Sequence, residues 1–283
     1  SRFRSDLPPL PPAPPHPSAM DSGGDSLAAV NDHIRRSGPE AKDESRAWLP
    51  LESNPDVLTA FARRVGLPED WEFVDVLGLD EELLQLVPQP VGALILLFPC
   101  TAGIYAARRQ QDAALQSGLK APKEDLFFVR QVPDFGNACG TIACLHALSN
   151  SRHIVEMAGD APLQSFVHSH WEEAPEARGR ALLTAERLKA PSDDAAEDRS
   201  AQTACPSRDG PPLDHHFVAF VRTPAGRVVE LDGTKRCPVD HGATTGATFL
   251  ADAVAAVKAD FVAADPGVNG FALMALTRRA AAG

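Results

Sequence analysis

The chain has 283 residues, of which 44% are hydrophobic and 23% charged, and its formal net charge at pH 7 is -11. This length and apolar content suffice for one large domain with a substantial core. Nucleic acid and anionic membrane surfaces repel an acidic chain, so neither is an expected partner and a basic partner is favoured.

The five cysteines are irregularly spaced and contain no CxxC pair. They predict neither a disulfide framework nor a zinc site, and they are typical of a reducing compartment. The longest strongly apolar run, Val91 to Phe98, is far shorter than the roughly 20 residues that cross a bilayer. No signal peptide is recognisable at the N-terminus. We therefore expect a protein of the cytoplasm or nucleus that needs no metal or other cofactor.

Residues 1–46 are expected to form a disordered, proline-rich tail. Seven prolines fall between Pro8 and Pro17, and a Ser/Gly/Asp stretch follows them. Such a segment cannot bury enough apolar surface to offset the entropy lost on ordering. The globular pattern begins abruptly afterwards, so we expect one folded domain over 47–283.

The first half of this domain predicts alternating helices and strands. A helix begins at Pro55, with Asn54 as its N-cap and Gly66 near its end. WEFVDVLGL predicts a strand, EELLQLV a short helix, and Val91 to Pro99 a fully buried strand. After a polar stretch, LFFVRQV at 126–132 predicts another strand.

The second half begins with a predicted helix over 139–149, for which Asn137 is placed as the N-cap. Helical periodicity continues over 163–171 and 175–189, and the polar, acidic stretch at 190–213 is expected to be a loop. HFVAFV and RVVELD predict a hairpin, and a helix over 250–262 and a last strand, FALMALT, follow. The fold class is therefore mixed α/β (α+β).

His216 and Asp232 are spaced to meet across this hairpin. Each lies eight residues from Pro224, so a turn centred there makes them direct cross-strand neighbours, with Cβ atoms roughly 5 Å apart. A carboxylate so placed would hold the imidazole ring in an otherwise apolar wall. The alternative is that His216 is an ordinary strand histidine and that Asp232 only forms a turn. A register slip of one residue would also break the pairing.

Cys139 strengthens the catalytic interpretation. It falls in the first turn of a predicted helix, where unpaired amides and the helix dipole stabilise a thiolate. Its small neighbours, Ala138 and Gly140, leave it open to a substrate. Cys144 lies in the apolar pattern of the same helix and Cys100 ends a buried strand, so both are expected to be inert core thiols.

Three segments resemble, in the same order, the signature regions of the ubiquitin C-terminal hydrolases, peptidase family C12. They are GNACGTIACLHALSN around Cys139, DHHFVAFV around His216 and VELDGTK around Asp232. The opening from WLPLESNP onwards is also similar, and the resemblance runs from Trp48 to about Thr277. It implies a papain-like cysteine peptidase fold, with a central antiparallel sheet flanked by helices and a crossover loop above the active site.

By motif, the resemblance assigns Cys139 as nucleophile, His216 as general acid/base and Asp232 as the residue that orients the imidazole. The glutamine that stabilises the oxyanion in this family matches Gln131. Here the chain departs from the pattern, because Gln131 lies eight residues before Cys139 instead of six, and strict counting lands on Pro133. Either the two extra residues bulge outward and leave Gln131 in place, or the oxyanion relies on the backbone amide of Cys139.

The resemblance implies a thiol-dependent deubiquitinating hydrolase that releases small adducts or peptides from the C-terminal glycine of ubiquitin, or of a ubiquitin-like protein such as Nedd8. In the predicted crossover loop, acidic residues such as Asp193 and Asp194 would attract the arginine-bearing tail of ubiquitin. The end of the chain at Gly283 favours the short, single-domain members, and we expect a monomer. The family's substrate contacts map most closely onto Pro50, Leu51, Glu52 and Asn54.

Other functions stay open. A ubiquitin-binding module with little or no hydrolase activity would share the fold; the spacing of Gln131 favours it weakly, and the intact Cys139, His216 and Asp232 oppose it. A different cysteine hydrolase or acyltransferase would lack ubiquitin-contact motifs, yet PLESNP is present. A nucleotide-binding protein is excluded, because no glycine-rich phosphate loop follows a predicted strand.

Overall fold

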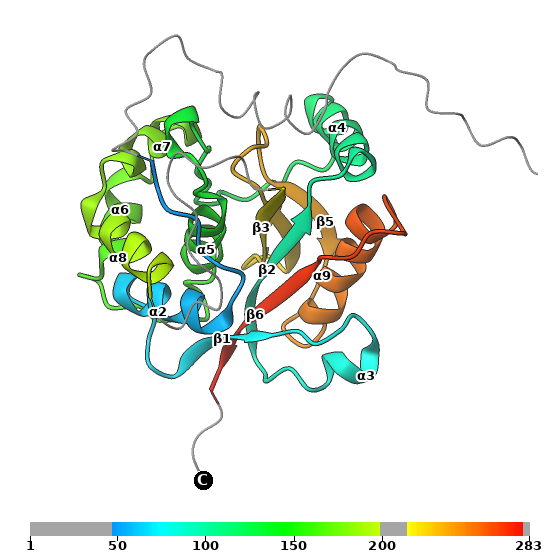
Figure 1. The fold of residues 1–283 in the computed structure, drawn as a ribbon, viewed down its shortest axis with the longest axis horizontal. Helices are drawn as coiled ribbons and strands as arrows, with labels where there is room; N and C mark the ends of the chain where they lie inside the picture. The colour runs from blue at the N-terminus through cyan, green and yellow to red at the C-terminus, as the bar shows by residue number, and fades with distance from the viewer. Residues whose placement is uncertain (1–46, 199–213, 280–283) are drawn as a thin grey trace, which may run out of the picture.

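The computed structural model describes residues 47–198 and 214–279, which form a six-stranded antiparallel sheet between two layers of helices (Figure 1). The strand order is β1-β6-β2-β3-β4-β5. This architecture confirms the predicted fold class, whereas the predicted tail at 1–46 lies outside the described residues. The strands are β1 (Trp71–Asp75), β2 (Val91–Pro99), β3 (His215–Arg222), β4 (Arg227–Leu231), β5 (Val239–Ala243) and β6 (Ala272–Arg278).

Each face of the sheet carries its own hydrophobic core and its own helices. The first core packs against α2 (Pro55–Val65), α5 (Cys139–Asn150), α6 (Pro162–His170), α7 (Pro175–Leu183) and α8 (Glu186–Ala196). The second packs against α3 (Glu81–Leu84), α4 (Ala102–Gln116), α9 (Phe249–Val257) and the π-helical turn η3 (Lys258–Val262). The two groups lie on opposite sides of the sheet in Figure 1.

Strand β2 shows why its sequence is apolar throughout. Ala93 and Ile95 belong to the first core, while Leu94 and Leu96 belong to the second. Alternate side chains of a strand point to opposite faces, so a strand covered on both sides buries every residue. Each fully buried Leu or Ile side chain contributes about 1.5–3 kcal/mol. The predicted buried strand is confirmed.

The register of the predicted hairpin differs by two residues from the expected one. Ala219 pairs with Leu231, so the turn is centred on Ala225, one residue later than predicted. His216 is therefore not directly opposite Asp232, and this part of the prediction is wrong. Because side chains alternate with a period of two, a shift by two residues still leaves both on the same face.

Helix α4 covers a polar stretch in which the sequence predicts no element. Thr101 caps it by accepting the amide of Ile104 at 3.3 Å. Its buried stripe consists of Ile104, Arg108, Gln111 and Leu115, at the spacing of one helix face. Two of these four positions are polar, so the apolar periodicity that identifies an amphipathic helix is missing.

The segment 126–132 pairs with no strand of the sheet, so the predicted strand is wrong. Side chains of α5 satisfy its amides instead: Phe127 N donates to Asn150 Oδ1, and Val129 N donates to His146 Nε2, both at 2.9 Å. Because these donors are already paired, the segment needs no strand partner. It runs beside α5 and leads directly to Gln131.

The predicted loop at 190–213 begins later than expected, because α8 continues to Ala196. The helix is anchored to α5 by the buried hydroxyl of Ser192, which lies 2.7 Å from the hydroxyl of Thr141. Ala195 and Ala196 of α8 are buried in the first core, although the sequence around them is polar. Residues 199–213, which hold most of the predicted crossover loop, lie outside the described residues.

Two acidic residues expected to attract ubiquitin are engaged within the domain. Asp193 accepts the backbone amide of Leu49 at 3.1 Å, and Asp194 forms an ion pair with Arg64 at 2.5 Å. Both contacts tie α8 to the N-terminal part of the domain. Their charges are partly neutralised there, which lowers their value as a docking surface.

Candidate active site

Cys139 is the first residue of α5, where this helix packs against β3. The approach is close, because a Cβ at Gly140 would lie only 3.3 Å from Leu51 and from Phe217. A larger residue beside the cysteine would require Leu51 or Phe217 to shift by a few tenths of an ångström. The contact places the start of α5 next to the residue that follows His216.

The predicted cap of this helix by Asn137 does not form. The N-cap is Ala138, and no side chain accepts from the amides of the first turn. Free amides at a helix start favour an anion. The sequence ACG therefore leaves the first turn of α5 available to stabilise negative charge near Cys139.

The thiol of Cys139 is half-buried, and desolvation raises its pKa above the ordinary value of 9.0. The backbone amides of Phe217, Gly140 and Cys139 itself oppose this shift in pKa by hydrogen bonding to the sulfur. The expected stabilisation of the thiolate by the helix start is present, but desolvation outweighs it. The thiol is therefore protonated at neutral pH in the free protein.

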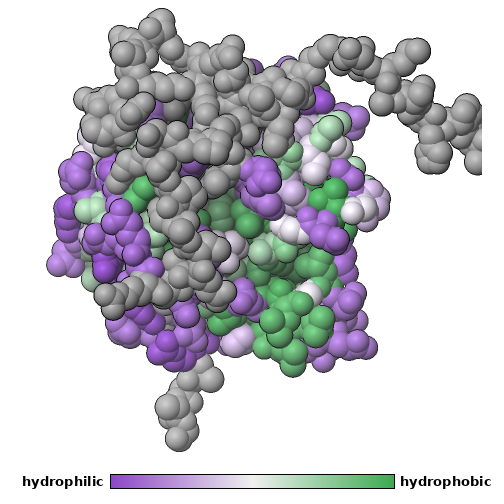
Figure 2. All heavy atoms as spheres, in the orientation of Figure 1, coloured by the Kyte–Doolittle hydropathy of each residue, from purple (hydrophilic) through white to green (hydrophobic). Residues whose placement is uncertain are grey.

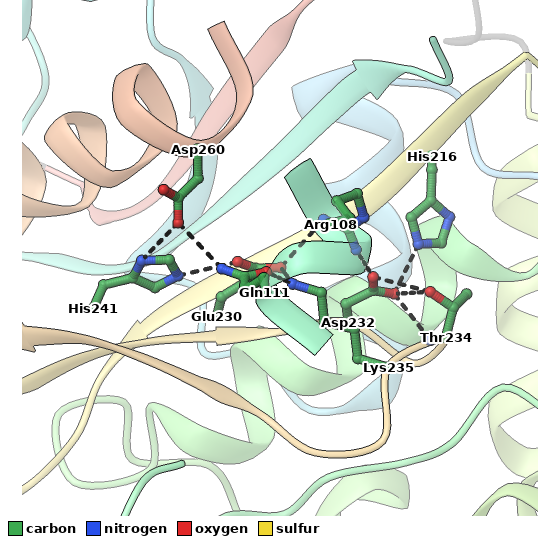
Figure 3. Close-up of polar contacts among 9 residues, drawn as sticks. All are labelled: Arg108, Gln111, His216, Glu230, Asp232, Thr234, Lys235, His241 and Asp260. Carbon is green, nitrogen blue, oxygen red and sulfur yellow. Dashed lines mark hydrogen bonds and ion pairs between the residues drawn. The ribbon is translucent and has the colours of Figure 1, made fainter. Parts of the chain in front are cut away.

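His216 and Asp232 form a buried pair in which His216 Nε2 lies 2.8 Å from Asp232 Oδ1 (Figure 3). Thr234 donates its amide to Oδ1 and its hydroxyl to both carboxylate oxygens, each at 2.9 Å. Arg108 forms an ion pair with Oδ2. The carboxylate is thus fixed on several sides. When Nε2 donates to it, Nδ1 is the nitrogen left to accept a proton.

Burial lowers the pKa of His216 from 6.5 to about 3, and the positive charge of Arg108 adds to this effect. The imidazole is therefore unprotonated at neutral pH, as a general base must be. Within the described part of the chain, no hydrogen bond joins His216 to the sulfur of Cys139. The site therefore holds a thiol and an unprotonated imidazole that are not hydrogen-bonded to each other.

Gln131 lies beside the loop that precedes Cys139. Its Nε2 donates to the carbonyl of Gly136 at 3.2 Å, and its Oε1 is buried without a hydrogen-bond partner. The intervening residues form a single 3-10 turn, η2 (Pro133–Phe135). An outward bulge of the two extra residues, the first of the two alternatives, would lie in this turn, and the role of Gln131 stays a prediction.

The family model of ubiquitin carboxyl-terminal hydrolase, family 1 (peptidase C12), matches residues 48–263. This chain belongs to that family. The matched range contains the whole site, from Cys139 to Asp232. Membership makes the protein a cysteine peptidase of the deubiquitinase class, as the sequence predicts.

Named relatives of this hydrolase are similar along nearly their whole length. The ubiquitin carboxyl-terminal hydrolase of Drosophila melanogaster is 36% identical over 230 residues, which cover 81% of this chain and 97% of that protein. Human ubiquitin carboxyl-terminal hydrolase isozyme L1 is 35% identical over 231 residues, which cover 82% and 98%.

Solved structures confirm the fold of this hydrolase. Trichinella spiralis UCH37 bound to ubiquitin vinyl methyl ester matches with a TM-score of 0.60 and 22% identity, over 82% of each chain. The catalytic domain of the same protein, in complex with the same compound, matches with a TM-score of 0.61 and 21% identity, over 83% of this chain and 98% of that one.

The predicted substrate contacts of the hydrolase, Pro50, Leu51, Glu52 and Asn54, precede α2 and are mostly buried. Leu51 is 3% exposed and packs against the position of Gly140. Asn54 is 7% exposed, and its side chain caps α2. Glu52 is half-buried and lines a surface cleft. Asn54 lines the same cleft but is buried, so Glu52 is the most accessible of the four.

Two residues that hold Asp232 were missed by sequence reasoning. Thr234 follows Asp232 by two residues, the spacing of an Asx turn, so the LDGT motif does contain a usable signal. Arg108 has no such signal, because α4 is not recognisable from its pattern. Its position relative to Asp232 depends on the packing of α4 against the sheet.

Cys100, Cys139, Cys144 and Cys237 are free thiols. Over 47–198 and 214–279, no three His, Cys, Asp or Glu side chains gather in a way that would hold a metal ion. Among the helices of these two ranges, none is both long and apolar enough to cross a membrane.

Replacing Gln131 with alanine is expected to lower kcat about 100- to 1000-fold with little change in KM. An oxyanion donor acts on charge that develops only in the transition state, so its loss appears in kcat. Steady-state hydrolysis of a fluorogenic amide at the C-terminus of ubiquitin measures the effect. Gln110→Ala, an exposed position on α4, is the control. A wild-type kcat in Gln131→Ala would mean that backbone amides alone stabilise the oxyanion.

Proposed function

We propose that this hydrolase cleaves the bond after the C-terminal glycine of ubiquitin, with Cys139 as nucleophile, His216 as general acid/base and Asp232 as its orienter. The observation that carries the proposal is the buried 2.8 Å contact between His216 Nε2 and Asp232 Oδ1, next to the helix start that bears Cys139. The names of the relatives, and the ubiquitin vinyl methyl ester bound to UCH37, favour ubiquitin as the substrate.

The chemistry follows from these groups. His216 Nδ1 takes the thiol proton, and the sulfur of Cys139 attacks the glycine carbonyl to form a tetrahedral oxyanion. The side chain of Gln131 and the amides at the start of α5 stabilise this oxyanion. The imidazolium returns its proton to the leaving amine as the thioester forms. Water, deprotonated by His216, then hydrolyses the thioester and frees the ubiquitin carboxylate and the thiol.

An acidic cleft near the predicted contact segment supports a basic ligand. The cleft has a volume of about 500 Å³ and lies between the start of α2 and β1. Four of its lining residues are acidic, and one of them, Glu72, is paired with Arg279. The arginine-bearing tail of ubiquitin has the charge that this surface attracts. The acidic residues are Glu52, Asp56, Glu72 and Asp75.

Charge reversal at Asp75 is expected to raise KM for ubiquitin substrates roughly 10-fold while kcat changes little, because Asp75 contributes binding that is equal in the ground and transition states. The difference between variant and wild type is expected to shrink at high salt. Steady-state kinetics at two ionic strengths measure both effects. Glu156→Lys reverses an exposed charge away from the cleft and is the control. An unchanged KM in Asp75→Lys would exclude the cleft from substrate binding.

The proposed function is tested by comparing fluorogenic amides of ubiquitin and of Nedd8 as substrates, with binding measured in parallel. Turnover of the ubiquitin amide at a rate well above that of Cys139→Ala supports a hydrolase, and the ratio of kcat/KM values decides between the two substrates. Tight binding of ubiquitin without turnover would instead establish the alternative, a ubiquitin-binding module.

Two further parts of the proposal concern the state of the protein. We propose a monomer, which size-exclusion chromatography with light scattering tests directly. We also propose that it works in the cytoplasm or the nucleus, where its thiols stay reduced. Imaging of the tagged full chain in cells tests this location.

A further inference from the structure

A buried ionic network lies behind His216, and the catalytic roles proposed above use only one of its members, Asp232 (Figure 3). The network joins α4 to the far end of the sheet and to η3. Its charged groups are almost completely shielded from solvent, except for Asp260, whose side chain is 30% exposed. The members are Arg108, Gln111, Glu230, Asp232, Lys235, His241 and Asp260.

Arg108 links this network to the proposed catalytic pair. Its side chain is 7% exposed; Nη1 lies 3.3 Å from Glu230 Oε1, and Nη2 pairs with Asp232 Oδ2. The carbon of the guanidinium lies 5.0 Å from the ring centroid of Phe98 and 5.4 Å from that of Phe261, at cation–π distance. These two rings leave the planar group little freedom. The planar fork of an arginine presents its N–H groups to two neighbouring carboxylates in fixed directions, whereas the ammonium of a lysine is a compact charge on a flexible stem.

Glu230 is the second carboxylate of this clamp, two residues before Asp232 and on the same face of the hairpin. Besides Arg108, it contacts Lys235 Nζ at 2.8 Å and His241 Nε2 at 3.0 Å. These partners hold the pKa of Glu230 well below its ordinary value in spite of full burial. Glu230 is therefore a permanent anion that fixes one end of the guanidinium, while the other end faces Asp232.

The two oxygens of Asp232 face different partners. Oδ1 contacts His216, and Oδ2 contacts Arg108, so the carboxylate lies between an imidazole and a guanidinium. Thr234 bonds to both oxygens but carries no charge. Without Arg108, a buried carboxylate would have no permanent cationic partner and would interact more strongly with a protonated His216.

We propose that Arg108 is a positioning residue of this active site: it holds Asp232 in the orientation that bonds His216 Nε2, and its charge offsets that of the carboxylate. The inference rests on the proposed function, because it assumes that His216 is the base. Its consequence is that Arg108, together with burial, extends activity to lower pH.

The charged groups around His216 shift its pKa in both directions, and Arg108 makes the largest contribution after burial. Arg108 from α4 and Lys235 from the turn after β4 both lower its pKa, and Glu230 raises it. Lys235 is itself buried, and its pKa is lowered to about 8, so it stays protonated at neutral pH. The start of α5 presents only the neutral thiol of Cys139. Removal of Arg108 therefore raises the pKa of His216 and moves the acid limb of kcat/KM to higher pH.

The test compares Arg108→Gln with Arg109→Gln, which removes the same charge from an exposed position one residue away on α4. In Arg108→Gln, kcat at the pH optimum is expected to fall about 10- to 100-fold, as when a supporting partner of an active-site group is lost. The acid limb is expected to move to higher pH, while Arg109→Gln matches the wild type. Rates are normalised to sites labelled by ubiquitin vinyl methyl ester, so a loss of folded protein does not count as a loss of kcat.

Arg108→Lys keeps the charge and removes the fork, so its acid limb is expected to stay in place while kcat falls. If Arg108→Gln does not fold, this variant decides: a wild-type kcat in folded Arg108→Lys would overturn the proposal. So would an unchanged acid limb together with an unchanged normalised kcat in Arg108→Gln.

An NMR titration of the His216 ring, in wild type and both variants, measures the pKa of His216 directly and needs no ubiquitin. A higher pKa for His216 in Arg108→Gln supports the inference even if the proposed substrate is wrong. An equal pKa in both proteins contradicts the inference while leaving the hydrolase function intact.

Discussion

Replacing Cys139 with alanine is expected to lower kcat for a ubiquitin C-terminal amide by about 10⁴-fold or more. No other group at the start of α5 can form the thioester. Without nucleophilic attack no oxyanion forms, so the remaining oxyanion donors have nothing to stabilise. Binding of ubiquitin is expected to persist, because the substitution removes one sulfur from a site that otherwise keeps its shape. Steady-state kinetics and calorimetry on the same preparations measure the two quantities.

Cys144→Ala is the matched control, since it makes the same chemical change five residues further along the same helix. Burial raises the pKa of the Cys144 thiol, and its side chain is fully enclosed in the core. This variant is expected to lose some stability and to keep its kcat. Residual turnover of Cys139→Ala at the wild-type rate would show that another group is the nucleophile.

Asp232→Asn is expected to lower kcat about 10²- to 10⁴-fold, as loss of the orienting carboxylate does in other hydrolases with a three-residue site. The amide offers only one oxygen, so it cannot accept from both His216 and Arg108. If its NH₂ faces His216 Nε2, the imidazole must present the other tautomer, with Nδ1 no longer able to accept the thiol proton. Steady-state kcat across a pH series measures the loss.

Asp240→Asn serves as the control for this prediction. Asp240 also belongs to the sheet and pairs with Arg227 at 2.9 Å, but it lies on β5 and makes no contact with His216. Its substitution is expected to affect stability and not kcat. An Asp232→Asn enzyme with more than about half of the wild-type kcat would mean that the ring of His216 is positioned by other contacts.

The hairpin shows how much of the site the sequence can predict. The spacing of His216 and Asp232 indicated that they share a face, and they do, although the turn lies one residue later than expected. Spacing alone fixes the face because side chains alternate, but it does not fix the register, which depends on the turn. The turn here includes Gly226 with φ 75°, a left-handed conformation that glycine adopts readily.

Helix α4 marks where sequence reasoning fails. Arg108 and Gln111 occupy core-facing positions that are usually apolar, so no periodicity reveals the helix. Their burial is possible only because Glu230, Asp232 and Asp260 supply partners from distant parts of the chain. A polar network of this kind is specified by tertiary structure, and here it contacts the proposed catalytic pair.

The segment 126–132 illustrates the converse error. Its apolar, aromatic composition is that of a strand, yet its amides bond to side chains of His146 and Asn150. These two polar residues lie in a helix whose other positions are mostly apolar. Local composition therefore predicts a strand where the backbone bonds instead to side chains of a helix.

Trapping the nucleophile is the most direct test that Cys139 is the catalytic thiol. The intact chain would be treated with ubiquitin vinyl methyl ester, and the product identified by intact mass and by peptide mapping. We predict a single ubiquitin adduct on Cys139 that does not form in Cys139→Ala. An adduct on another cysteine, or no adduct from a protein that binds ubiquitin, would contradict the assignment of Cys139 as the catalytic thiol.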